Sequence, residues 1–132
     1  METAVLGVMT QENKQLLLKD LCTRLPYNVK INIKDDYSQK MVDDILCAYH
    51  IGGISYNLES RNLRPYLRKM SSMTEEEQRT LDSMCNGVEM VSRLSGLKMF
   101  DKAFAWLLAN HFDFRGLIEK GLALEAKEGM YK

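Results

Sequence analysis

The spacing of apolar residues changes at Pro26, and this change constrains the fold more than any other feature of the sequence. Before Pro26, apolar side chains recur at helical spacing from Leu16 to Leu25, and Thr10 is placed to cap a helix that begins at Gln11. After Pro26, apolar and polar residues alternate over residues 29–34, which is typical of a half-buried strand. The two periods predict an α+β fold with an amino-terminal helix.

Two further strands are predicted, because apolar side chains alternate again over residues 42–51 and 54–58. The pair Gly52-Gly53 lies between them, and two adjacent glycines suit a tight hairpin turn that requires a positive φ at both central positions. Together with the first strand, these segments predict a small antiparallel sheet of three strands.

The second half of the chain predicts two or more helices. Thr74 and Glu77 form a capping-box pattern, so a helix should begin at residue 75 and end near Asn86-Gly87, where the glycine suits the position after a helix. A second amphipathic helix is expected at about residues 98–110, followed by a turn-rich segment over residues 112–132. We expect these carboxy-terminal helices to pack on one face of the sheet.

Composition and charge exclude several classes of protein. The 132 residues, 45% hydrophobic and 27% charged, predict that residues 1–132 form a single compact domain with one core. Eighteen basic residues balance eighteen acidic ones, so no overall field attracts nucleic acid, membranes or acidic substrates. The three cysteines lie far apart, which predicts reduced, buried thiols. No apolar run resembles a membrane span or a secretion signal, so we expect a cytoplasmic protein.

Residues 61–69 are the most suggestive stretch for ligand binding. They lie in an expected connector over residues 61–73 that contains no acidic residue, and Pro65 disfavours helix there. Guanidinium groups interleaved with an aromatic ring suit phosphate groups and stacked bases. The candidate anion- or partner-binding residues are Arg61, Arg64, Tyr66, Arg68 and Lys69. The alternative is that these cations pair internally with acids of the neighbouring helix, such as Glu75 to Glu77.

Signatures of enzymes are absent from the sequence: it contains no phosphate-binding glycine loop, no nucleophile-elbow motif and no C-x-x-C pair. Cys47 and His50 are close in sequence, but residues three apart on a strand point to opposite faces, so we expect no cooperation and a core position for Cys47. We interpret His111 and Asp113 as a helix C-cap contact, with a general base as the alternative. We expect no catalytic residue, metal site or cofactor.

Much of the chain resembles an uncharacterised family of small proteins from gut Bacteroides and their phages and prophages. The resemblance lies in residues 18–36, which include Lys19-Asp20-Leu21-Cys22, in Leu63-Arg64-Pro65-Tyr66-Leu67-Arg68-Lys69 with the following residues to Glu77, in residues 106–126, and in Gly129-Met130-Tyr131. The chain departs from the family where the family has a second histidine just before His111 and a tyrosine in place of Phe114. The departure argues against a two-histidine metal site. The resemblance implies a bacterial or phage cytoplasmic setting and carries over no catalytic residue.

These observations predict a non-enzymatic accessory protein of a phage or other mobile element. We expect it to act as an adaptor or regulator that binds another protein through its exposed sheet face, its sheet edge or the basic connector. One alternative is weak, salt-dependent nucleic-acid binding through residues 61–69. A second alternative is a small enzyme that uses a histidine or a cysteine. The sequence leaves the partner and the oligomeric state open.

Overall fold

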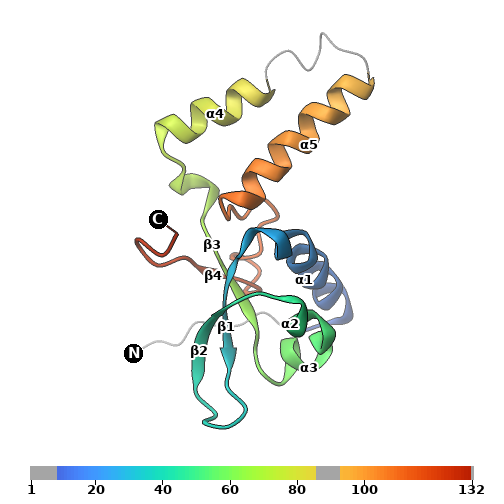
Figure 1. Cartoon of the computed structure of the whole chain (residues 1–132), viewed down its shortest axis with the longest axis vertical. Helices are drawn as coiled ribbons and strands as arrows, with labels where there is room; N and C mark the ends of the chain where they lie inside the picture. Colours follow the sequence, from blue (N-terminus) through green and yellow to red (C-terminus); the bar gives the residue numbers. More distant parts are fainter. Residues whose placement is uncertain (1–8, 86–92, 132) are drawn as a thin grey trace.

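A computed structural model describes residues 9–85 and 93–131 and shows the predicted α+β fold (Figure 1). In chain order the elements are α1 (Gln11–Arg24), the 3-10 turn η1 (Leu25–Tyr27), β1 (Lys30–Lys34), β2 (Met41–Ile45), α2 (Ala48–Gly52), α3 (Ile54–Glu59), β3 (Arg64–Leu67), the 3-10 turn η2 (Met70–Ser72), α4 (Glu75–Cys85), α5 (Arg93–Ala109) and β4 (Leu124–Glu125).

The first helix and the first strand agree with the prediction. Thr10 caps α1, because its hydroxyl oxygen accepts the backbone N–H of Asn13 at 3.1 Å. Pro26 lies in η1 directly after the helix, and Asn28 adopts a left-handed conformation with φ 56°, which redirects the chain. Along β1 the residues are alternately half-buried and buried, as expected for a strand with one face on the core.

The prediction of strands over residues 42–51 and 54–58 is wrong for most of these residues. β2 ends at Ile45, and residues 48–59 form the short helices α2 and α3. Ile51, Ile54 and Leu58 pack on the core from these helices. Their spacing of three and four residues places them on one face of a helix. Gly52-Gly53 is therefore no hairpin turn, and neither glycine has a positive φ.

The sheet contains four strands in the order β2-β1-β3-β4, one more than predicted. β1 pairs antiparallel with both β2 and β3, whereas β3 and β4 are parallel. β3 lies within the stretch predicted to be a connector. Pro65 pairs with Ile31, and the backbone N–H and carbonyl of Ile31 point to β2 and not to β3. No hydrogen bond between β3 and β1 therefore requires an N–H at position 65, so proline is tolerated there.

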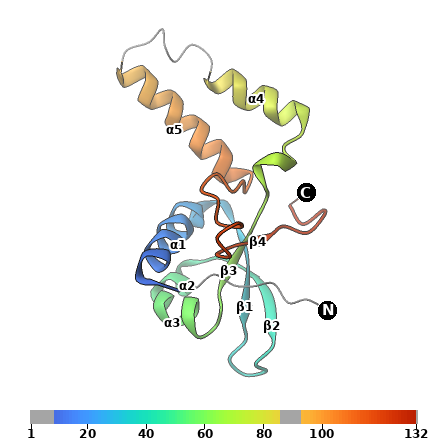
Figure 2. The same ribbon diagram turned by 180° about the vertical axis from the view of Figure 1, so that it is seen from behind.

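Helices α1, α2 and α3 cover one face of this sheet (Figures 1 and 2). The core between them consists of Leu17, Leu21, Val29, Ile31, Ile33, Leu46, Leu58, Leu63, Leu67, Leu117, Leu122 and Ala123. The last three come from the segment after α5, so the core requires both ends of the described chain.

Helices α4 and α5 pack against each other and extend beyond one end of the sheet, instead of lying on its face as we expected (Figure 2). α5 reaches the rest of the protein at its carboxyl end, where it contacts α1. The predicted end of the first of these helices, Asn86-Gly87, lies outside the described residues.

The chain after α5 returns to the sheet and completes its hydrogen bonding. The Tyr131 hydroxyl accepts the backbone N–H of Lys30 at 2.8 Å and donates to the carbonyl of Tyr66 at 2.7 Å. It therefore lies between β1 and β3 where their direct pairing ends, and it satisfies one backbone group of each strand. The turn-rich carboxy-terminal segment thus contributes to the sheet through β4 and through this hydroxyl.

A buried ionic network joins α1 to the segment after α5. Asp20 and Arg24 are fully buried, and the Arg24 Nε donates to the Asp20 carboxylate at 2.8 Å. The Nη2 of Arg24 donates to the carbonyl of Phe112 at 2.8 Å, and Arg115 donates to the second oxygen of Asp20. One carboxylate therefore pairs with two guanidinium groups and connects segments that are far apart in the sequence.

We expect Asp20→Asn to lower the free energy of unfolding by about 3 kcal/mol or more, because it leaves the guanidinium of Arg24 buried without a counter-charge. Urea unfolding at neutral pH measures the effect. The matched control is Asp101→Asn on the exposed surface of α5, for which we expect a change within about 0.5 kcal/mol. Equal stabilities of the two variants would contradict a structural role for the network.

Candidate functional site

The five residues singled out in the sequence do not form one open patch. Arg64 and Tyr66 belong to β3, Arg61 precedes this strand, and Arg68 and Lys69 follow it. Arg64 and Tyr66 are two residues apart and share a face of β3, but each of the five side chains is engaged by a different group of the protein.

Arg64 and Tyr66 are both buried. The Arg64 Nη1 donates to the carbonyls of Leu58 at 3.0 Å and Leu63 at 2.7 Å, and burial lowers the pKa of this guanidinium. The Tyr66 hydroxyl donates to the Asp43 carboxylate at 2.7 Å, and burial together with this carboxylate raises the pKa of Tyr66. Neither side chain is placed to contact an incoming phosphate or base.

Arg61 is held at the other end of β3. Its Nε donates to the carbonyl of Lys34 at 2.8 Å and lies 3.5 Å from an Asp36 carboxylate oxygen, and its Nη1 donates to Asn57 at 3.4 Å. It borders a shallow hollow of about 400 Å³ whose other lining residues are Asp36, Tyr49, Gly52, Gly53, Tyr56 and Asn57. The charge of Arg61 is compensated within this hollow by Asp36.

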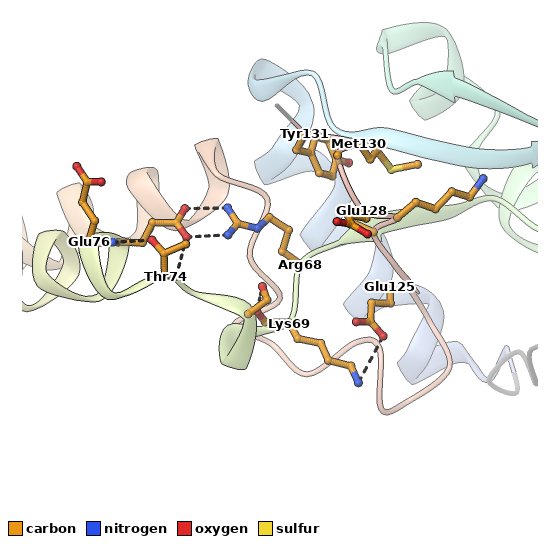
Figure 3. A pocket seen from close by; sticks show the side chains of 13 residues that line it. Arg68, Lys69, Thr74, Glu76, Glu125, Glu128, Met130 and Tyr131 are labelled. Atoms are coloured by element: carbon orange, nitrogen blue, oxygen red, sulfur yellow. Dashed lines mark hydrogen bonds and ion pairs between the residues drawn. The ribbon is translucent and has the colours of Figure 1, made fainter.

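Arg68 forms the strongest ion pair of the stretch, with Glu77 (Figure 3). The two carboxylate oxygens of Glu77 accept Nη1 and Nη2 of Arg68 at 2.9 and 2.7 Å, and the guanidinium also lies over the ring of Phe112. Glu77 and Thr74 form the predicted capping box at the start of α4. The Arg68 hydrogen bonds, followed by the Thr74 N–H, lower the pKa of Glu77 to about 2.

A groove of about 530 Å³ separates this ion pair from the carboxy-terminal segment (Figure 3). Arg68, Lys69 and Thr74 line one side, and residues 125–131 line the other. Lys69 reaches across to Glu125 at 3.5 Å, and Lys127 on the far side lies 3.4 Å from Asp43. The cations around this groove are therefore matched by acids of the protein itself.

These contacts support the alternative in which the basic stretch pairs internally. Arg68 holds β3 to α4, Arg61 holds it to the β1–β2 turn, and Lys69 reaches Glu125 of β4. A phosphate group would have to compete with Glu77, Asp36 and Glu125 for these cations.

The largest unprotected feature of the sheet is β2, which is its edge strand and is exposed at all five residues. Met41, Val42 and Ile45 keep 44%, 41% and 47% of their surface accessible. Val42 pairs with the buried Ile33 and therefore lies on the core face of the sheet, yet α1 to α3 do not cover it. Both faces of this strand thus present apolar surface to solvent.

The outer edge of β2 also presents backbone hydrogen-bonding groups. Two hydrogen bonds at the ends of the β1–β2 ladder show which of its residue pairs are hydrogen-bonded. The Asp35 N–H donates to the carbonyl of Lys40, and the Leu46 N–H donates to the carbonyl of Val29. Because such pairs alternate, the backbone groups of residues 41, 43 and 45 point away from β1. The Ile45 N–H is satisfied by the side chain of Asp44 at 2.7 Å. In the described part of the chain, no strand pairs with this edge.

The structure overturns the predicted separation of Cys47 and His50. Because residues 48–52 are helical, residues three apart lie close together, and the Cys47 Sγ is 3.5 Å from the His50 Nδ1. The Nε2 of His50 faces the Asp44 carboxylate at 3.4 Å. The prediction of buried thiols is also wrong, since Cys47 is exposed, as are Cys22 and Cys85.

His111 takes the C-cap position that we expected, while Asp113 stabilises the next turn. His111 has φ 64° just after α5, and the backbone N–H groups of His111 and Phe112 bond to carbonyls of the last helical turn at 3.0 Å each. The Asp113 carboxylate accepts the N–H groups of Leu117 and Ile118. The His111 ring stacks on Tyr131, and burial, with the nearby cations Arg24, Arg68 and Lys30, lowers its pKa to about 4.

Sequence reasoning missed Asp20 and Arg24. Their signal was present, because a charged pair spaced by four residues flanks Leu21 on the apolar face of α1. Counting charged residues on a predicted core face would have identified them as a buried pair.

The described residues contain no group of three or more His, Cys, Asp or Glu side chains arranged to hold a metal ion. Among the helices that the structure describes, none combines the length and the apolar character needed to span a bilayer. Comparison of the chain with protein-family models, with curated proteins and with solved structures finds no match.

We expect Glu77→Gln to destabilise the protein by about 1–2 kcal/mol at pH 7, because it removes a charge-assisted bidentate contact. The folded-state pKa of Glu77, about 2, lies below its ordinary value of 4.5. The stabilisation is therefore present above pH 4.5 and is lost as the pH falls toward 2. Urea unfolding at several pH values should show the difference between the two proteins shrinking over this range. The exposed Glu76→Gln is the control, and a pH-independent difference would contradict the assignment.

The titration of His111 should give the free energy of unfolding a second pH dependence, over a different pH range from that of Glu77. Its pKa is lowered from 6.5 to about 4, so the unfolded chain binds a proton between these values while the folded protein does not. Stability should therefore fall as the pH falls from 6.5 toward 4. His111→Asn tolerates the left-handed backbone but cannot titrate, so its stability should depend less on pH between 7 and 4.5. Parallel unfolding curves of variant and parent at both pH values would contradict this.

Proposed function

We propose that the protein is a non-enzymatic adaptor or regulator that binds an extended segment of another protein along the outer edge of β2. The single observation that carries the proposal is an edge strand exposed over its whole length, with apolar side chains on both faces. Proteins usually protect such a strand by covering, shortening or bending it, so an open one suits strand addition by a partner. The resemblance to phage and prophage proteins supports an accessory role in the cytoplasm of a bacterial host.

The backbone of β2 supplies the affinity in this proposal. Outward-facing N–H and carbonyl groups at residues 41 and 43, with the carbonyl of residue 45, give a partner strand a ladder to extend. The partner's side chains would then cover Met41 and Ile45 on one face and Val42 on the other. Specificity comes from these alternate contacts.

The charges on β2 indicate which residue types the partner segment carries. Asp43 and Asp44 are the central residues of β2, and their side chains keep 45% and 58% of their surface accessible. Carboxylates on an edge discourage the pairing of two identical edges. Asp43 is engaged by Tyr66 and Lys127, whereas the described ion pairs give Asp44 only His50, so Asp44 favours a segment that carries lysine or arginine. Both carboxylates also repel phosphate groups, which favours a protein partner over nucleic acid. The partner is therefore an extended, apolar segment that contains basic residues.

We expect Met41→Pro to weaken partner binding at least tenfold, because proline removes an outward N–H and places a ring at the edge. The probes are synthetic peptides of about ten residues, selected from a random displayed library on the immobilised protein. Their affinities for parent and variant are measured by calorimetry. NMR should place the largest amide shifts of the parent protein on residues 41–45.

Met41→Thr is the matched control, because it removes the apolar side chain but keeps the backbone donor. Met41→Thr should retain much of the affinity for the selected peptides if the backbone hydrogen bonds of β2 contribute more to binding than the Met41 side chain does. Selected peptides that bind Met41→Pro as tightly as the parent would overturn strand addition. Failure to select any peptide with amide shifts on β2 would overturn the binding role itself.

A further inference from the structure

Two exposed tyrosines flank the shallow hollow that Arg61 borders. Tyr49 lies in α2 and Tyr56 lies in α3, and they keep 77% and 55% of their surface accessible. Both residues line the hollow of about 400 Å³, together with Gly52 and Gly53. A single exposed aromatic ring is common on a protein surface, but two at one hollow offer a flat apolar group a contact on two sides.

The two glycines of this hollow lie between the tyrosines in the sequence, and the fold itself does not require them. Among the described residues, a Cβ at Gly52 would meet no atom within 4 Å, and a Cβ at Gly53 would meet only the Asn57 Nδ2, at an ordinary distance of 3.6 Å. Neither glycine has a positive φ. Glycine also weakens a helix relative to alanine. Bare backbone here leaves room for a ligand to approach closely.

The hollow also contains hydrogen-bond donors that the protein does not use. In the described part of the chain, no contact engages the Nη2 of Arg61, and this atom is not among the buried atoms that lack a partner, so solvent reaches it. The hydroxyl of the exposed Tyr49 has no described partner either. Asn57 is buried, and its Nδ2 donates to the carbonyl of His50 at 2.8 Å while its Oδ1 accepts Arg61, so it positions the guanidinium.

Charge and hydrogen bonding together indicate the class of ligand. Asp36 and Arg61 are the charged residues among those that line the hollow, and they lie 3.5 Å apart, so no net charge attracts a phosphate. Single-stranded nucleic acid would stack on tyrosine but also needs cations along its backbone. A proline-rich segment is neutral, and each proline presents a ring and a carbonyl acceptor but no N–H. Its rings suit the tyrosines, and its carbonyls suit the unused donors.

We propose that this hollow binds a proline-rich segment of a partner protein in the polyproline II conformation. Three residues complete a turn of that helix, so prolines three positions apart lie about 9 Å apart on one side. These rings pack on Tyr49 and Tyr56 over the bare backbone at Gly52, and a carbonyl accepts the Nη2 of Arg61. Aromatic-lined shallow sites recognise such segments because the extended helix is formed before binding. A run of prolines lacks the N–H groups that β2 would need, so this inference is independent of strand addition.

Capped octaproline is the probe, because it adopts the polyproline II conformation and carries no charge. It is titrated to millimolar concentration into isotope-labelled protein, and amide shifts are followed by NMR. We expect saturable shifts on residues 49–57 and on Arg61, with residues 41–45 unchanged. A capped glycine–serine peptide of equal length is the control, since it is neutral but flexible and has no rings, and it should cause no shifts. Absence of saturable shifts at the hollow with octaproline would overturn the proposal.

Two tyrosine variants form a matched pair. Tyr49→Ala should weaken octaproline binding at least about tenfold, because it removes one wall of the hollow. Tyr37→Ala should leave the affinity unchanged, because Tyr37 is 98% exposed in the β1–β2 turn and does not line the hollow. Both substitutions are at exposed positions, so both variants should unfold at the same urea concentration as the parent. Equal affinities of the two variants for octaproline would overturn the proposal.

Gly52→Ala separates binding from folding. The added methyl group meets no described atom of the protein, so stability should be kept or increased, while the methyl group occupies the space between the tyrosines and should lower the affinity for octaproline several-fold. Unchanged affinity would contradict the close approach to this backbone. Maltohexaose, a neutral sugar, is titrated in the same way. Shifts at the hollow with maltohexaose and not with octaproline would assign the hollow to carbohydrate and overturn the proposal.

Discussion

The carboxylate of Asp20 is the contact on which the arrangement of the two halves depends. It pairs with both Arg24 and Arg115, and Arg24 in turn donates to the carbonyl of Phe112. A guanidinium buried without such partners costs several kcal/mol, so α1 and the chain after α5 are stable in the interior only together. The carboxyl end of α5 is therefore held to the core, and the α4–α5 pair extends from that point.

The basic stretch before α4 is part of the scaffold, because its cations are engaged by the protein. Arg68 makes three contacts: its backbone pairs with the chain after α5, its guanidinium binds Glu77 of α4, and the same group lies over Phe112 of the chain after α5. Arg64 donates to the carbonyl of Leu58 in α3 and to the carbonyl of Leu63. At the opposite edge of the sheet, no strand of the described residues pairs with the outer side of β2, and all five residues of β2 are exposed.

The region after β2 shows how strongly chemistry depends on local backbone geometry. On a strand, Cys47 and His50 would point to opposite faces, whereas the first turn of α2 brings the sulfur and the imidazole within 3.5 Å. The apolar residues of 48–59 fit either period, so periodicity could not decide between them. The helices form because Ile51, Ile54 and Leu58 bury against the core from one side.

Short-range signals determined several elements without any tertiary information. The Thr10 cap, the alternation around Ile31 and the Thr74–Glu77 capping box each act within a few residues, and the structure confirms them. Tertiary packing decided what local signals cannot encode: that β3 enters the sheet, that β2 remains at its edge, and that Asp20 meets Arg115. The physical reason is that exposure and ion pairing depend on which distant segments become neighbours, and those neighbours are set by burial of the shared core.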